Sequence, residues 1–128
     1  MRLLLAICLS ITFAAPLSAQ NHRAPEGVVV SAVADGFAVT DGGGFGARGV
    51  WCAAADYAQT ELGAGITTEI YIIQPRTSGR GAVIFSTDPA GVVPQQVFIT
   101  GLSLRQSGAR LNVGHALGFC ADAQGANR

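Results

Sequence analysis

Trp51-Cys52-Ala53-Ala54-Ala55-Asp56-Tyr57-Ala58 is the stretch that decides the expected fold. Apolar side chains recur there at helical spacing, which predicts a helix over residues 50–62 with one face formed by positions 51, 54, 55, 58 and 62. Gly63 follows directly and suits the end of a helix. The three consecutive alanines allow close packing, and we expect this helix to lie on a sheet.

A hairpin and a glycine-rich loop are predicted ahead of this helix. Residues 28–33 are rich in β-branched side chains, and residues 37–40 alternate apolar with small or polar ones, as strands do. Asp35-Gly36 suits the tight turn between them, although an irregular lead-in over residues 28–33 is an equally fair interpretation. Residues 41–49 contain five glycines and are expected to form a loop.

Further strands are predicted after the helix. Residues 66–73 and 82–86 have the composition of strands and favour an antiparallel hairpin. Strand character resumes at residues 97–100 and is expected to continue through Leu104, with a bulge or break at Gly101.

A closing helix is predicted over residues 113–123, because Asn112 is a good N-cap and Cys120 falls on the apolar side of this segment. The order of elements predicts an α+β fold, an antiparallel sheet of 3–5 strands with two helices packed on one face and joined by one disulfide. The expected boundaries are a signal peptide at 1–19, a flexible leader at 20–27, a single domain at 28–123 and a flexible tail at 124–128.

The start of the chain has the features of a secretory signal peptide. Arg2 supplies a positive charge, residues 3–15 are almost wholly apolar, and Ala19 offers a small residue for cleavage. Since no later stretch approaches the roughly 20 apolar residues of a membrane span, we expect a periplasmic or secreted protein without stable membrane insertion. The remaining 109 residues (128 − 19) carry seven arginines and eight acids. This balance argues against nucleic acid as a partner.

Export would remove Cys8 and leave Cys52 and Cys120, an even number in an oxidising compartment, so we expect a disulfide between them. Closing so long a loop is worth about 4 kcal/mol in chain entropy. A redox pair, or a nucleophile activated by His115, is the alternative. The two cysteines lack C-x-x-C spacing, and His115 lies about 140° round the predicted helix from Cys120.

Residues 44–49 match G-x-G-x-x-G, the pattern of a dinucleotide-binding turn. Such a fold needs repeated βα units and an acid at the end of the next strand, whereas Glu69 comes at that strand's start. We therefore expect a loop and no cofactor, although backbone N–H groups at the helix start, helped by Arg48, could hold an anion. The two histidines are too few for a zinc site, and no metal is expected.

Four more arginines are candidates for gripping a carboxylate or phosphate, because they fall in two loops at strand ends: Arg76, Arg80, Arg105 and Arg110. Solvated turn arginines are the alternative interpretation.

Four segments carry a resemblance to a known group of proteins: 50–58 (Val-Trp-Cys-Ala-Ala-Ala-Asp-Tyr-Ala), 70–72 (Ile-Tyr-Ile), 85–89 (Phe-Ser-x-Asp-Pro) and 115–120 (His-Ala-Leu-x-Phe-Cys). In these segments the sequence resembles small exported proteins of unknown function from Gram-negative bacteria. The resemblance implies fold and location and no activity. The first hypothesis is a non-enzymatic periplasmic domain that binds another protein or a small anionic ligand. The alternative is a small hydrolase or anion-dependent enzyme around His115, with Asp56 or Tyr57 nearby.

Overall fold

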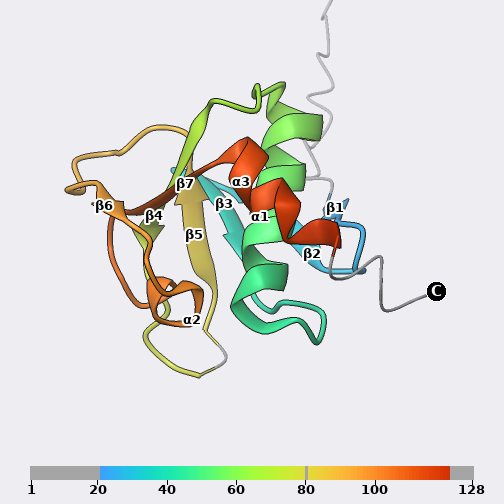
Figure 1. Ribbon diagram of the computed structural model, residues 1–128, viewed down its shortest axis with the longest axis horizontal. Coiled ribbons are helices and arrows are strands. Elements are labelled where there is room, and N and C mark those ends of the chain that lie inside the picture. The colour runs from blue at the N-terminus through green and yellow to red at the C-terminus, as the bar shows by residue number, and fades with distance from the viewer. Residues whose placement is uncertain (1–20, 80, 122–128) are drawn as a thin grey trace, which may run out of the picture.

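The computed structural model describes residues 21–79 and 81–121 (Figure 1). The predicted signal peptide, Arg80 and the predicted tail lie outside the described residues. Within them the chain forms, in order, β1 (His22–Arg23), β2 (Val29–Val33), β3 (Gly36–Val39), α1 (Gly46–Leu62), β4 (Glu69–Gln74), β5 (Val83–Ser86), β6 (Gln95–Gln96), α2 (Thr100–Ser103), β7 (Ala109–Asn112) and α3 (Val113–Gly118).

One sheet contains all the described strands in the order β1-β2-β3-β5-β4-β7-β6. Every neighbouring pair is antiparallel except β6 and β7, which run parallel, so the sheet is mixed. The predicted antiparallel sheet of 3–5 strands with two helices is therefore wrong, because the described chain has seven strands and three helices. The two edge strands are only two residues long, too short for any periodicity to mark them.

The two predicted hairpins are present. β2 pairs with β3 from Val30↔Val39 to Val33↔Gly36, so the valine run is a strand and not an irregular lead-in. β4 pairs with β5, with a register shift between Ile72 and Gln74. Gly36 in β3 also lies close to β5, its neighbour in the sheet, since a Cβ on Gly36 would lie 1.9 Å from the carbonyl oxygen of Phe85. Local alternation and turn residues thus predicted the hairpins correctly.

The helix predicted over 50–62 is α1, but it begins at Gly46, inside the expected glycine loop. The loop folds back onto the first turn of the helix, where a Cβ on Gly49 would lie 2.0 Å from the carbonyl oxygen of Gly42. The helix ends as predicted, with Gly63 in the left-handed conformation and its N–H bonded to the carbonyl of Ala58.

The expected strand over residues 97–104 is wrong, since this segment contains the short helix α2. The cause is packing: Ser103 and Leu104 are drawn into the core, and Oγ of Ser103 accepts a 2.9 Å hydrogen bond from Nε1 of Trp51. Residues 109–112, whose composition gives no strand signal, form β7 instead. Asn112 caps the last helix as predicted, with its side chain accepting from the N–H of His115, but α3 ends at Gly118.

The core lies between the sheet and α1, with α3 packed beside α1 (Figure 1). Trp51 is fully buried and meets Phe85 edge-on, with ring centroids 5.1 Å apart. Phe37 stacks on Phe85 and also contacts Tyr57. None of the helices in the described segments is long and apolar enough to cross a membrane.

Candidate functional site

A disulfide between Cys52 and Cys120 fastens α1 to the segment that follows α3, with a Cα–Cα distance of 5.0 Å. This confirms the predicted pairing. The two half-cystines differ in access: Cys52 is fully enclosed within α1, whereas Cys120 is 7% exposed. The candidate site around this bond comprises Glu26, Cys52 and Cys120.

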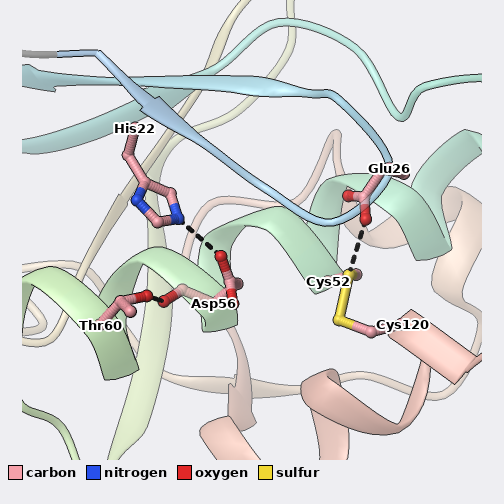
Figure 2. Close-up of a disulfide and its surroundings, with 6 residues drawn as sticks. All are labelled: His22, Glu26, Cys52, Asp56, Thr60 and Cys120. Carbon is pink, nitrogen blue, oxygen red and sulfur yellow. Dashed lines mark hydrogen bonds and ion pairs between the residues drawn. A yellow bond between two sulfur atoms is a disulfide. The ribbon is translucent and has the colours of Figure 1, made fainter.

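Glu26 comes to the disulfide from the turn between β1 and β2. The turn is closed by backbone hydrogen bonds from Ala24 N–H to Val28 and from Gly27 N–H to Ala24. Oε2 of Glu26 lies 3.0 Å from Sγ of Cys52 (Figure 2). A disulfide sulfur carries no hydrogen, so the carboxyl group can donate a hydrogen bond to it only when protonated.

The protonation of Glu26 follows from its surroundings. Burial raises the pKa of this carboxyl above its ordinary value of 4.5. A hydrogen bond to its own backbone opposes this shift, and the negative charge of Asp56 adds to it. Oε1 of Glu26 is buried and has no hydrogen-bond partner among the described residues, an arrangement less costly for a neutral carboxyl than for a carboxylate.

Two acids of α1 hold His22, at the start of the same turn. Nε2 of His22 lies 2.5 Å from Oδ2 of Asp56, and Nδ1 lies 3.0 Å from Oε1 of Glu61. Figure 2 shows His22 and Glu26 reaching toward α1 from the same hairpin, with Thr60 bonded to the backbone carbonyl of Asp56. The turn carrying Glu26 is thereby anchored over the disulfide.

The glycine loop closes the other side of this turn. A Cβ on Gly43 would lie 3.0 Å from Cγ of Glu26, and Gly43 has a φ of 61°. Gly43 lies just before the G-x-G-x-x-G match at residues 44–49. Within the match, Gly49 allows close packing against Gly42, whereas Gly44 and Gly46 have open space around them and adopt positive φ values of 90° and 61°.

The predicted anion-binding arginines that the structure describes lie in different places. Arg76 donates 2.8 Å hydrogen bonds to the carbonyls of Gly81 and Thr40, and so joins two loops. The Arg48 guanidinium lies 5.7 Å from the ring centroid of Phe119. Arg110 lines a hollow together with Glu69 and His115, while Arg105 is exposed.

His115, the centre of the enzyme alternative, is exposed and packs against Phe119 with ring centroids 5.6 Å apart. Asp56 and Tyr57, its expected partners, both contact the other histidine, His22. Within residues 21–79 and 81–121, the His115 ring forms no hydrogen bond with a carboxylate or a hydroxyl.

Sequence reasoning missed Glu26 and His22, which fall in the segment expected to be a flexible leader. That segment contains β1, and Ala24 within it is buried. No local pattern marks Glu26, because its contact with Cys52 is made across 26 positions of the chain.

A second feature is an apolar surface formed by Phe98, Ile99 and Leu102, which are 86%, 61% and 56% exposed. These side chains line a hollow of about 350 Å³ together with three amides, Gln95, Gln96 and Gln106. The surface borders β6, the last described strand at this edge of the sheet.

A metal ion would have one candidate ligand set among the described residues, because Glu26, Cys52 and Cys120 offer ligand atoms within 4.8 Å of one another. The two sulfurs are bonded to each other and are not thiolates, so the set is not a metal site in this oxidised form.

No family model matches the chain, and no curated protein or solved structure is significantly similar to it.

Proposed function

We propose that the chain is an exported, non-enzymatic domain that binds another protein through the apolar surface of Phe98, Ile99 and Leu102. The observation that carries this proposal is the exposure of Phe98, of which 86% is accessible although it is a large apolar side chain. Exposed apolar side chains that gather around one hollow are typical of a protein-binding surface, while singly exposed ones are ordinary.

The chemistry of the surroundings favours a protein partner with an apolar contact face. Residues 92–104 contain no charged side chain, and the rim of the hollow is made of glutamine amides. The nearest cation along the chain is the exposed Arg105, and a single cation is too little to attract an anionic membrane. An aromatic anchor within a rim of neutral polar groups is how protein interfaces are commonly built.

The neighbouring strand adds a second way to hold a partner. β6 ends the sheet at this side and pairs only with β7 among the described strands. An edge strand presents backbone N–H and C=O groups that can pair with an extended segment of another protein. The partner would then contribute backbone hydrogen bonds beside an apolar side chain seated against Phe98.

Export is supported by the apolar N-terminal segment and by the disulfide, because disulfides form and persist in oxidising compartments. The small anionic ligand of the first hypothesis receives less support, since the described arginines are not gathered around one hollow.

The test places a photo-crosslinking amino acid at position 98 of the full chain expressed in its native host. We expect a discrete cross-linked protein band on illumination. The matched control carries the same group at position 62, because Leu62 is also half-exposed and apolar but lies at the end of α1. Identical band patterns at the two positions, or none at position 98, would contradict the proposed surface.

A further inference from the structure

We propose that the Cys52–Cys120 disulfide is a thiol-exchange site in which Cys120 is the sulfur attacked and Glu26 is the proton donor to Cys52. The inference is independent of the proposed binding function. It rests on the unequal exposure of the two buried half-cystines, 0% for Cys52 and 7% for Cys120, and on the position of the carboxyl group.

The direction of attack follows from burial. A thiolate must approach the sulfur it attacks in line with the bond that breaks, so exchange depends on access to that sulfur. Cys52 lies inside α1 and is fully enclosed, whereas Cys120 follows α3 and keeps some exposure. An incoming thiolate therefore forms its new bond with Sγ of Cys120, and the electron pair of the broken S–S bond stays on Sγ of Cys52.

The expelled sulfur of Cys52 needs a proton, because a thiolate enclosed among apolar side chains is costly. Oε2 of Glu26 is 3.0 Å from this sulfur, within the reach of proton transfer (Figure 2). The proton moves from the Glu26 carboxyl group to Cys52, which leaves a neutral thiol and a carboxylate.

The reaction balances with a dithiol as the reductant. The first thiolate of the reductant forms a mixed disulfide with Cys120. The second thiol of the reductant then loses a proton to solvent and attacks the sulfur that the reductant contributed to this mixed disulfide. Cys120 leaves as a thiolate, the reductant becomes a disulfide, and the two cysteines have taken up two electrons. In the reverse direction the Glu26 carboxylate accepts the proton of Cys52, whose thiolate attacks a mixed disulfide at Cys120.

The groups around Glu26 favour its neutral form before the reaction. Asp56 faces it from α1 and raises its pKa, adding to the effect of burial. His22, on β1, is held by Asp56 and Glu61. The glycine loop contributes Gly43, which has no titratable side chain.

The test follows reduction of the oxidised full chain, carrying Cys8→Ser so that only the two disulfide cysteines react, by dithiothreitol. Samples are quenched with N-ethylmaleimide, and the alkylated protein is measured by intact-protein mass spectrometry. Each reduction rate is divided by the concentration of the thiolate form of the reductant at that pH. We expect Glu26→Gln to slow reduction at least about tenfold at pH 4.5, the ordinary pKa of this carboxyl, above which burial raises it, since positioned acids contribute at least this much. Asp35→Asn, which removes an exposed carboxylate elsewhere, should leave the rate unchanged.

Two further measurements test the same step. The normalised rate of the Cys8→Ser chain should fall as the pH rises through the titration of Glu26, and this slope should be lost in Glu26→Gln. Brief treatment with glutathione, followed by peptide mapping, should place the mixed disulfide on Cys120. A Glu26→Gln rate equal to that of the parent chain, glutathione on Cys52, or a rate independent of reductant concentration would each overturn the proposal.

Discussion

Nε2 of His22 lies 2.5 Å from Oδ2 of Asp56, so the edge strand β1 is tied to the middle of α1. A two-residue strand has little hydrogen bonding of its own to hold it in the sheet. The side-chain contact therefore does much to keep the turn with Glu26 over the disulfide.

Replacing His22 with Ala is expected to lower the free energy of unfolding by about 1 kcal/mol, because a part-buried hydrogen bond to a charged group is lost. Backbone amide exchange of Ala24 and Gly27, whose N–H groups close the turn, should become faster, while exchange within α1 stays slow. Arg23→Ala, an exposed change in the same strand, is the control. Equal exchange rates at Gly27 in the two variants would show that His22 does not anchor the turn.

Glu26→Gln should raise the melting temperature relative to the parent protein at pH 7 and have a smaller effect at pH 4. Burial raises the pKa of Glu26 in the folded state, so the folded protein binds this proton more tightly than the unfolded chain does. The resulting stabilisation is complete below the unfolded pKa and is lost as the pH rises through the folded pKa. Gln stays neutral throughout, and scanning calorimetry across this range measures the difference. A difference between the two proteins that does not change with pH would contradict this assignment.

Ser103→Ala should cost about 1–3 kcal/mol, because the buried indole N–H of Trp51 loses its hydrogen-bond acceptor. Urea unfolding followed by the fluorescence of the single tryptophan measures the change. Ser107→Ala, at an exposed position four residues further on, should be close to neutral. If both variants unfold at the same urea concentration, the hydrogen bond contributes little.

Gly49→Ala should destabilise the protein by about 1–3 kcal/mol through overpacking, although alanine is the better helix former. The added Cβ would lie 2.0 Å from the carbonyl oxygen of Gly42, so the loop would have to move. Gly65→Ala is the matched control, because no atom lies within 4 Å of the Cβ position there. A thermal unfolding temperature unchanged by Gly49→Ala would contradict the close packing described for the glycine loop.

The parts of the fold that sequence analysis predicted correctly are those whose signal is local. The apolar face of α1, the glycine that ends it, the hairpin turn at Asp35-Gly36 and the cap at Asn112 all depend on residues within one or two turns of the chain. The disulfide was predictable for a different reason, because the expected loss of Cys8 with a signal peptide would leave a single possible pair.

The parts that failed depend on contacts between distant segments. Gln95 and Gln96 are polar and follow a proline, and they form a strand only by pairing with β7. Residues 97–104 have the composition of a strand, yet Ser103 lies in the core, where its hydroxyl accepts a hydrogen bond from the indole N–H of Trp51. A short helix forms there instead of a strand.

The sequence by itself determined the body and the end of α1, the β4–β5 hairpin and the identity of the two bonded cysteines, because periodicity, turn chemistry and cysteine number act within short segments or by simple count. For the β2–β3 hairpin the sequence left a strand and an irregular lead-in equally open, and for α1 it missed the first turn. Only the tertiary structure decided that the sheet is mixed, that Phe98 stands in solvent and that Glu26 meets Cys52. The mixed sheet and the Glu26–Cys52 contact depend on pairing and packing between residues far apart in the chain. Phe98 is left exposed where the residues that follow it, Ser103 and Leu104, enter the core instead.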